Sequence, residues 1–370
     1  MKEKLKILHI NTVDNDRNGV GQIVNAIHNN AYLFGFSSSL LTGNFNSLTY
    51  KLNVLKSRLW DEDGFLVTKK TKRLSNQIIL EKPDLVHLHN LHGYYCDIRS
   101  IDSVLRILQV PVIITMHDLW LCTGRCAHPP NGFCSYFFER SCRKCPFRER
   151  YPAKWIPGNP KLFEKLNFLK DKTLVVPSQW MASKVELMTG MQPLVIPNGI
   201  DKSFFHPYET AAHDSNKRLL AIASKWTTSK GRDDLIKIAD TLPSEWTFTV
   251  VGNIAPNHPK INKTGYLSSK QKIANLIANS TALVSVSHEE SFGLTVAEAL
   301  AMKKPVIVRK NTAPEEMISD KSFVTDFVDN KSFNSILSGL SNFSTTYIPI
   351  DISEMAALYY KLYTRLLNSQ

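Results

Sequence analysis

The chain has 370 residues, of which 43% are hydrophobic and 21% are charged, an ordinary globular composition. This length suits two domains of about 150–200 residues each. No apolar run reaches the roughly 18 residues needed to cross a bilayer, and the apolar stretch after the basic N-terminus is too short for a signal peptide. We therefore interpret this stretch as a first buried strand, and we expect a cytoplasmic protein that could also dock on the inner face of the plasma membrane.

The net charge is +12 and is unevenly distributed. Residues 1–200 hold 26 Lys and Arg against 16 Asp and Glu, whereas the remaining residues hold 19 against 17. A strongly basic half attracts nucleic acids, anionic lipid headgroups or phosphorylated substrates, and charge alone does not choose among them.

In the first half of the chain, apolar β-rich runs alternate with helical patterns. This alternation predicts a parallel sheet with helices on both faces. The expected strands are 6–11, 39–42, 85–89, 110–115 and 173–177, and the expected helices are near 20–27, 98–108 and 179–188.

A turn at Pro197-Asn-Gly199 separates this half from a second strand–helix cycle. We therefore predict an α/β chain of two Rossmann-like, doubly wound domains, residues 1–198 and 199–352, followed by a C-terminal helix in 353–370. In such sheets ligands bind at the carboxyl ends of the strands. The second cycle has expected strands at 219–223, 248–252, 282–287 and 305–308, and expected helices near 232–241, 268–278 and 294–302.

The most informative motif runs from His288 to Leu300, directly after an expected strand. Glu290 and Glu298 are eight positions apart, and Gly293 stands where a helix should begin. The amides of Phe292, Gly293 and Leu294 would then be unpaired donors for an anionic oxygen. Carboxylates suit sugar hydroxyls because they accept two hydrogen bonds, although acidic residues also favour helix starts without any ligand.

A second motif, from Ser224 to Gly231, places Lys225 and Lys230 in a short loop between a strand and a helix. Two lysines in such a loop can neutralise a diphosphate leaving group. A solvated surface loop is the alternative interpretation.

Two further motifs follow strands of the first half. Gly19 and Gly21 come after the first strand and would let the backbone approach a phosphate or a sugar, although the full dinucleotide-binding pattern is missing. His117, followed by Asp118, stands at the end of the strand 110–115 and could donate to a sugar oxygen.

Four cysteines fall within 20 residues and form a Cys-rich cap in 122–152. The pair Cys142 and Cys145, with Cys126 and Cys134, could hold a structural Zn²⁺, and disulfides or free thiols are the alternatives. Four thiolates leave no open position, so catalytic zinc is not expected. Basic and aromatic residues interleave over 137–151, which suits an anionic membrane surface, a single-stranded nucleic acid or a plain solvated cap.

Taken in this order and spacing, the motifs resemble the GT4 family of retaining glycosyltransferases, which have the GT-B fold. Glu290 and Glu298 resemble the family's E-x7-E signature, and Lys225 with Lys230 resembles the Arg–Lys pair that holds the donor diphosphate. Lys at position 225 replaces a bidentate fork with a point charge. Residues 198–201 resemble the family's hinge, and the helix with Tyr359 and Tyr363 resembles the one that returns to the first domain. The chain departs from the family at Thr312-Ala313, where two glycines are usual.

Residues 50–160 resemble the colanic acid and exopolysaccharide branch of this family. The carrying motifs are the run from Pro83 to Gly93, the run from Thr115 to Trp120, and the Cys142-x2-Cys145-Pro segment. The resemblance implies a hexosyltransferase that assembles surface polysaccharide on a glycan or lipid-linked saccharide acceptor.

The family further implies two domains facing across a cleft, with the acceptor on the first and a UDP- or GDP-sugar on the second. Glu290 would hold donor-sugar hydroxyls, Glu298 the ribose, and His117 the transferred sugar. No metal cofactor is expected in catalysis, because Lys225, Lys230 and helix amides would stabilise the leaving diphosphate.

Two other functions stay open at this point. A nucleotide-sugar 2-epimerase of the same fold would convert the sugar nucleotide without an acceptor. A non-enzymatic nucleic-acid-binding protein with a zinc knuckle would bind DNA or RNA with a steep salt dependence. For a glycosyltransferase, we expect no nucleic-acid partner.

Overall fold

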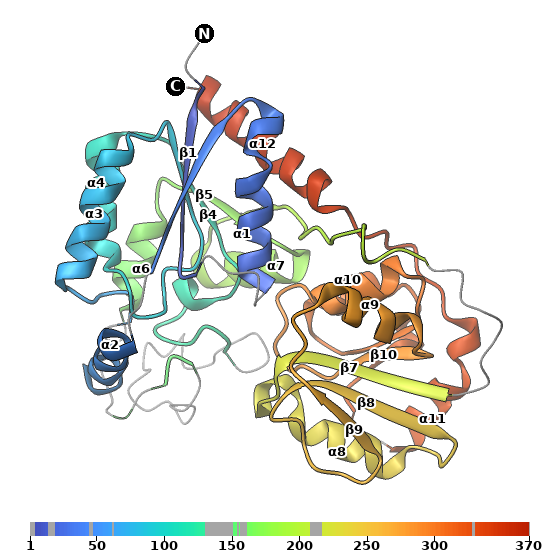
Figure 1. The fold of residues 1–370 in the computed structure, drawn as a ribbon. Coiled ribbons are helices and arrows are strands. Elements are labelled where there is room, and N and C mark those ends of the chain that lie inside the picture. The colour runs from blue at the N-terminus through green and yellow to red at the C-terminus, as the bar shows by residue number, and fades with distance from the viewer. Residues whose placement is uncertain are drawn as a thin grey trace. The chain divides into compact units, whose positions relative to one another are not determined.

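The computed structural model describes residues 4–13, 19–43, 47–60, 63–129, 151–153, 155, 161–207, 217–327 and 330–369. The chain divides into two compact units, Met1–Pro197 with Ser353–Gln370, and Asn198–Ile352 (Figure 1). The division after Pro197 lies one residue from the boundary that the Pro-Asn-Gly turn predicted. Each unit has its own sheet and its own hydrophobic core.

The first unit is built on a six-stranded sheet in the order β2-β1-β3-β4-β5-β6, in which every pairing is parallel. Its central strands are short and largely buried, as expected for a parallel sheet covered by helices, and they are mostly apolar, with buried polar residues such as His9 and His87 among them. The strands are β1 (Lys6–Asn11), β2 (Ser37–Thr42), β3 (Leu85–Leu88), β4 (Val112–Thr115), β5 (Thr173–Val176) and β6 (Leu194–Val195).

Helices with one apolar face cover this sheet. In α4 (Ile98–Leu108), the side chain of Asp97 caps the first turn and Gln109 ends the helix in the left-handed conformation. The others are α1 (Gly19–Asn29), α2 (Ser47–Trp60), α3 (Lys69–Glu81), α6 (Leu162–Leu169), α7 (Gln179–Thr189) and the 3-10 turns η1 (Ala31–Phe34) and η2 (Trp120–Cys122).

The C-terminal helix α12 (Ile352–Asn368) packs on the first unit, as predicted. Tyr360 donates a hydrogen bond to the carbonyl of Ile27 in α1, and the hydroxyl of Tyr363 lies 2.7 Å from Nδ1 of His87 in β3. Both tyrosines are buried, so the helix is an integral layer of this unit.

The second unit has a six-stranded parallel sheet in the order β12-β11-β10-β7-β8-β9. The strands are β7 (Lys217–Lys225), β8 (Trp246–Asn253), β9 (Ile261–Gly265), β10 (Ala282–Ser285), β11 (Val306–Arg309) and β12 (Val324–Thr325). The helices are α8 (Arg232–Thr241), α9 (Lys270–Ala278), α10 (Leu294–Ala301) and α11 (Asn330–Ser338), with 3-10 turns η5 (Thr228–Lys230), η6 (Ala313–Met317), η7 (Lys321–Phe323) and η8 (Leu340–Asn342).

The two doubly wound sheets confirm the predicted α/β class. The ends of several strands and helices differ from the predicted ones. The strand expected over 282–287 ends at Ser285, because the chain turns out of the sheet before Val286. The sequence-based prediction missed α2, α3, α6, α11, β6, β9 and β12. Edge strand β9 has no apolar run, and β6 and β12 have two residues each. In the described part of the chain, no helix is long and apolar enough to cross a membrane.

Candidate functional site

In the second unit, two loops at the carboxyl edge of the sheet bring Lys230 and Glu290 together. Strands β7 and β10 are neighbours, so the loops that follow them meet. The amide of His288 donates to the carbonyl of Ser229 over 2.9 Å, which ties the loops backbone to backbone. Nζ of Lys230 lies 2.8 Å from Oε2 of Glu290. A cation and a carboxylate from different segments thus share one edge of the sheet.

Gly231 makes this approach possible. Its φ is +78°, and a Cβ atom there would lie 2.3 Å from the carbonyl oxygen of Val286. Only glycine tolerates both the left-handed backbone and a neighbouring chain at that distance. The glycine after Lys230 therefore sets how closely the two loops pack.

Lys225 lies at the exposed end of β7, five residues before Lys230. The next residue, Trp226, is buried and donates from its indole nitrogen to the carbonyl of Val251 over 3.0 Å. This anchor holds the loop against β8 and leaves the Lys225 side chain in solvent. Both predicted lysines therefore belong to one braced loop.

Helix α10 begins beside Glu290. Gly293, at φ +93°, precedes its first residue, and a Cβ atom there would lie 2.5 Å from Cγ of Pro314. Within the described chain, no acceptor pairs with the amides of Gly293, Leu294 or Thr295. Of the three amides that the sequence analysis named, those of Gly293 and Leu294 lie at the N-terminus of α10, where helix amides lack an intrahelical acceptor. The Phe292 side chain is buried in the core of this unit, so only its backbone could face a ligand.

The loop after β11 closes the other side of Glu290. The amide of Ala313 donates to the Glu290 carbonyl over 3.1 Å, and the Thr312 hydroxyl donates to the carbonyl of Arg309 over 2.7 Å. The Thr-Ala pair that stands in place of two glycines thus fixes the Glu290 backbone.

A buried carboxylate that the sequence-based prediction missed supports both loops. Asp234 pairs with Arg309, with Lys237 at 3.0 Å, and with Nε2 of His288 at 2.9 Å. Burial raises the pKa of Asp234, but the hydrogen bond from His288, with the charges of Lys237 and Arg309, outweighs it and leaves the pKa below its usual value. Asp234 and Arg309 gave no motif in the sequence, because their contact joins residues 75 positions apart.

Glu298 is the fifth residue of α10, eight positions after Glu290, and its side chain is half-buried. Burial of the carboxyl raises its pKa to about 8, with Lys270 lowering it and Asp201 raising it further. At neutral pH most of this carboxyl is protonated, so it can donate one hydrogen bond as well as accept others.

In the first unit, Gly19 and Gly21 form the start of α1, and Gly21 is buried. Residues 14–18, which contain the rest of that motif, lie outside the described residues. His117 follows β4 as predicted and is 6% exposed. Burial lowers the pKa of His117 to about 4, although Asp118 opposes this, so its imidazole is neutral at pH 7.

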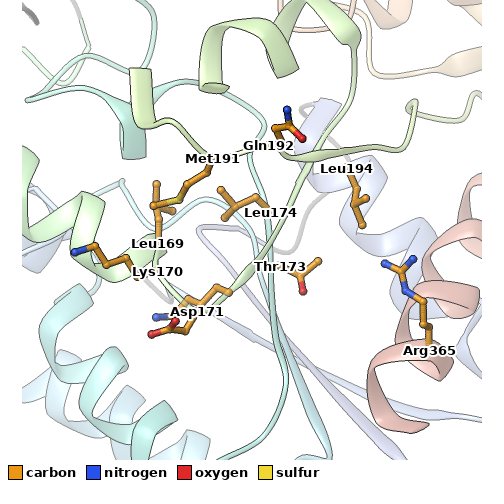
Figure 2. A pocket seen from close by; sticks show the side chains of 10 residues that line it. Leu169, Lys170, Asp171, Thr173, Leu174, Met191, Gln192, Leu194 and Arg365 are labelled. Atoms are coloured by element: carbon orange, nitrogen blue, oxygen red, sulfur yellow. The ribbon is translucent and has the colours of Figure 1, made fainter. Parts of the chain in front are cut away.

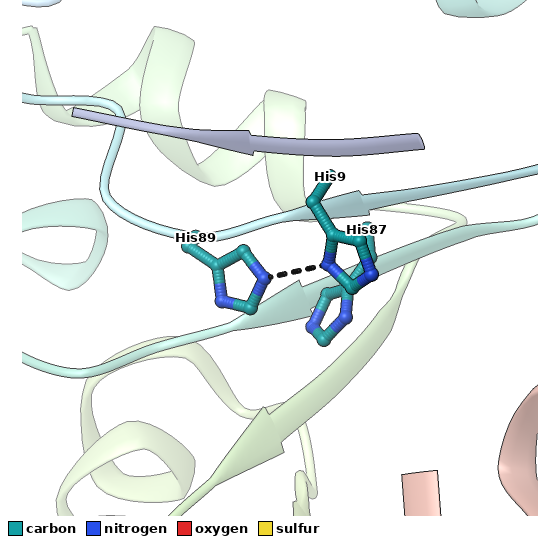
Figure 3. A group of neighbouring side chains, drawn as sticks. All are labelled: His9, His87 and His89. Atoms are coloured by element: carbon teal, nitrogen blue, oxygen red, sulfur yellow. Dashed lines mark hydrogen bonds between the residues drawn. The ribbon is translucent and has the colours of Figure 1, made fainter. Parts of the chain in front are cut away.

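Three more buried histidines lie near His117: His9 in β1, His87 in β3, and His89 directly after β3. Nδ1 of His89 lies 3.2 Å from Nε2 of His117, and Nε2 of His89 lies 3.1 Å from Nδ1 of His9 (Figure 3). The ring of His87 packs against that of His89 at a tilt of 38°, with ring centroids 4.0 Å apart. Burial lowers the pKa of all three, that of His9 to about 3. In the sequence, His87 and His89 appeared only within the motif from Pro83 to Gly93 that carries the family resemblance, and His9 was not singled out.

His92 and Asp118 form a separate ion pair beside His117, with 2.7 Å between Nε2 and Oδ2. Burial lowers the pKa of His92, but Asp118 outweighs it and the net pKa is raised. Burial raises the pKa of Asp118, but His92 outweighs it and lowers the pKa to about 2.

Ring nitrogens of His9, His87 and His89 lie within 4.8 Å of one another, close enough to be considered as metal ligands. Both nitrogens of His87 are already bonded, to the hydroxyls of Tyr363 and Thr115 at 2.7 Å each. The predicted zinc ligands Cys134, Cys142 and Cys145 lie outside the described residues, and Cys126 is a buried thiol.

A hollow of about 530 Å³ in the first unit lies between the starts of β5 and β6 and Arg365 of α12 (Figure 2). Thr173 and Leu194, which line it, are the first residues of their strands. Ligands of doubly wound sheets bind at the opposite edge. We therefore assign this hollow no part in the site.

Two family models match the chain side by side. The model for Glycosyltransferase Family 4 matches residues 43–204, and the model for Glycosyl transferases group 1 matches residues 209–340. Among curated proteins, the chain is 23% identical over 290 residues to the colanic acid biosynthesis glycosyl transferase WcaC of Escherichia coli (strain K12), covering 73% of this chain and 70% of that protein.

Solved structures of the GT-B fold match nearly the whole chain. A sucrose-phosphate synthase from Thermosynechococcus elongatus has a TM-score of 0.67 at 12% identity and covers 99% of this chain and 100% of its own. Anabaena Alr3699/HepE, in complex with UDP and glucose, has a TM-score of 0.63 at 15% identity and covers 98% and 100%. Similarity at these identities establishes the shared GT-B fold.

Proposed function

Because the chain belongs to the family 4 glycosyltransferases, we propose that it transfers a hexose, with retention, from a nucleoside diphosphate sugar to a glycan or lipid-linked saccharide. The observation that carries this proposal is the pairing of Lys230 with Glu290 beside the unpaired amides at the start of α10. Cationic and carboxylate groups at one strand edge suit a ligand with a diphosphate at one end and sugar hydroxyls at the other.

The second unit would bind the donor. Negative charge on the diphosphate grows as the bond to the anomeric carbon breaks, and Lys225, Lys230 and the α10 amides would stabilise it. In the apo structure Lys230 is neutralised by Glu290. A diphosphate would take over Lys230, which leaves the carboxylate of Glu290 to accept hydrogen bonds from donor-sugar hydroxyls.

Glu298 would bind the ribose. Its protonated carboxyl can donate to one ribose oxygen and accept from the other hydroxyl, and its ionised form can accept from both. If the ribose selects the ionised form, binding at pH 7 releases up to one proton, since the pKa of the unliganded carboxyl is about 8.

The first unit would supply the acceptor side, with Gly19 and Gly21 close to the donor and His117 hydrogen-bonded to the transferred sugar. In the proposed front-face step, the anomeric carbon–phosphate oxygen bond breaks as the bond to the acceptor oxygen forms. The acceptor's proton passes to the leaving phosphate oxygen, so no protein nucleophile or metal is needed. The neutral state of His117 allows it to donate or accept without adding charge.

We propose surface polysaccharide assembly as the biological context, supported by the similarity to a protein named for colanic acid biosynthesis. That context puts the enzyme in the cytoplasm, at the inner face of the plasma membrane, where a lipid-linked acceptor would be presented.

Helix α2 supports contact with an anionic membrane. Its buried face carries the polar Asn53 and Ser57, whereas Leu48, Leu52 and Leu55 point to solvent at i, i+4 and i+7. Lys51 and Lys56 are exposed on the same helix. An apolar stripe flanked by lysines is typical of a helix that lies in a headgroup layer. Leu52→Ser with Leu55→Ser should weaken sedimentation with anionic vesicles, and unchanged sedimentation would contradict this role.

We also propose a structural zinc in the Cys-rich cap. Nη2 of Arg125 lies 3.8 Å from Sγ of Cys126, and a neighbouring cation favours the thiolate form that a metal needs. Elemental analysis of tag-free protein should find about one zinc per chain; a metal-free preparation that is fully folded and active would refute the site.

Product analysis tests the proposed reaction. The protein is incubated with UDP-, GDP- and ADP-sugars, with and without a lipid-linked saccharide mixture, and the products are followed by NMR. We expect a new glycosidic linkage with the donor's anomeric configuration only when acceptor is present. Inversion would refute retention, and conversion of the donor sugar without acceptor would instead indicate an epimerase.

A further inference from the structure

Three buried imidazoles form an unbroken hydrogen-bonded chain that ends at His117. Nδ1 of His9 lies 3.1 Å from Nε2 of His89 (Figure 3). Nδ1 of His89 in turn lies 3.2 Å from Nε2 of His117. Successive rings are nearly parallel, at 19° and 22°. Each link therefore joins the Nδ1 of one ring to the Nε2 of the next.

The three rings can share protons in only two ways when each is neutral. In one arrangement, every Nδ1 carries the proton: His9 donates to His89, and His89 donates to His117. In the other, every Nε2 carries it and the donations run in reverse. One link cannot switch alone, because two bare nitrogens or two N–H groups would then face each other. The tautomer of His117 is therefore coupled to that of His9.

The surroundings of His9, at the inner end of the histidine chain, determine which arrangement is favoured. Nε2 of His9 is inaccessible to solvent and has no hydrogen-bond partner in the described part of the chain. The first arrangement leaves a bare nitrogen there, whereas the second leaves an unpaired N–H. Among backbone groups, a buried N–H without a partner is rarer than an under-satisfied acceptor, and we extend that rule to the imidazole of His9 to choose the first arrangement.

We propose that His9 and His89 are positioning residues that hold His117 as the neutral Nδ1–H tautomer. His117 then points a hydrogen-bond donor away from the chain, where no residue of the described structure bonds to its Nδ1. The use of this donor on the transferred sugar rests on the function proposed above; the tautomer itself does not.

The surrounding contacts keep the three linked histidines neutral and hold their rings in place. Burial lowers the pKa of His9, His89 and His117, and no carboxylate is hydrogen-bonded to any of the three among the described residues. His87 packs against His89 and is itself held on both sides by Tyr363 of α12 and Thr115 of β4. A metal ion at His9, His87 and His89 is disfavoured, because it would displace these bonds and bury two positive charges without an anion.

Nitrogen-15 NMR tests the proposal on the substrate-free protein. With histidine labelled on both ring nitrogens, protonated and bare nitrogens resonate in separate ranges, and couplings across N–H···N bonds report which ring donates. We expect Nδ1–H at pH 7 for all three histidines, assigned from the spectra of His9→Asn, His89→Asn and His117→Gln. A proton on Nε2 of any of the three, or on both nitrogens, would overturn the proposal.

Two variants at position 89 test whether the linked histidines position His117. The amide of Asn occupies the place of Nδ1 and can still donate to His117, whereas Phe cannot. We expect His89→Phe to lower kcat about tenfold or more with the KM for nucleotide sugar nearly unchanged, and His89→Asn to recover most of it. The control is His258→Asn, at a histidine of the second unit that bonds to Asp240 and has no contact with the histidine chain; this variant should keep wild-type kcat.

Equal kcat for His89→Phe and wild type, or an Asn variant no better than Phe, would refute the positioning role. If His89→Phe does not fold, the wild-type spectrum still decides the tautomer. If no transfer occurs with any acceptor while the expected tautomers are observed, the proposed function fails and the histidine chain stands.

Discussion

Lys230 and Glu290 form an ion pair of 2.8 Å across two loops that are 60 positions apart in sequence. The pair is half-exposed, at 35% and 25% for the two side chains, so its own contribution to stability is small. Its significance is geometric, since it fixes where a cation and a carboxylate meet at the carboxyl edge of the second sheet.

Removing either Lys230 or Glu290 should nearly abolish transfer and leave the fold intact. We expect Lys230→Ala and Glu290→Ala each to lower kcat/KM by on the order of 10²–10³, because each would remove a charged contact to the donor. The melting temperature should change little. Lys217→Ala and Glu245→Ala, at an exposed pair of 3.1 Å in the same unit, are matched controls that should keep full activity. Wild-type turnover in Lys230→Ala would remove this lysine from the site.

Gly231 and Gly265 provide a matched test of loop packing. Both have left-handed backbones, at φ +78° and +72°, but a Cβ atom at Gly231 would lie 2.3 Å from a carbonyl oxygen whereas one at Gly265 meets nothing within 4 Å. We expect Gly265→Ala to cost about 1 kcal/mol of unfolding free energy and Gly231→Ala several, with loss of transfer. Urea unfolding of both variants measures this, and equal costs would contradict the close loop contact.

Glu298 should make the stability fall as the pH rises. Its folded pKa is about 8 against an ordinary 4.5, so between these values the folded state holds a proton that the unfolded state has released. This one group should lower the unfolding free energy by about 3 kcal/mol between pH 6 and 9. Glu298→Gln should remove that slope in urea unfolding. If Glu298→Gln keeps the wild-type slope of unfolding free energy against pH, the carboxyl of Glu298 is already ionised in the folded protein over this pH range.

The buried histidines should have the opposite effect, so that the protein becomes less stable as the pH falls. The folded pKa values of His9 and His117 are about 3 and 4, below the ordinary 6.5, so the unfolded state binds more protons as the pH falls below 6.5. Each should lower the unfolding free energy by about 2 kcal/mol at pH 5, and His92, whose pKa is raised, opposes this. His9→Asn should lose stability less steeply between pH 7 and 5. An unchanged slope would mean that His9 is already protonated in the folded state.

The sequence predicted the parts of the fold whose apolar pattern is local. The helix from Arg232 to Thr241 and the helix from Ile98 to Leu108 have the predicted bounds, because capping residues and glycines mark their ends. Edge strand β9, with the exposed sequence Asn262-Lys-Thr264, has no such pattern and owes its place to pairing with β8.

The candidate site was predictable where it follows a motif. Lys230 and Glu290 stand in recognisable loops, but their ion pair, and the network of Asp234 with Arg309, depend on strand order that no local pattern encodes. The histidine chain joins residues 80 and 28 positions apart, so its existence follows from the register of β1 and β3 rather than from spacing.

Calorimetric titration with UDP, GDP and ADP, in the presence of a metal chelator, tests the central claim most directly. We expect at least one of them to bind the wild-type protein and Lys217→Ala with equal affinity, at one site per chain, and to bind Lys230→Ala at least tenfold more weakly. No binding of any nucleoside diphosphate, or equal binding by Lys230→Ala, would contradict the claim that Lys230 and the start of α10 form a diphosphate site.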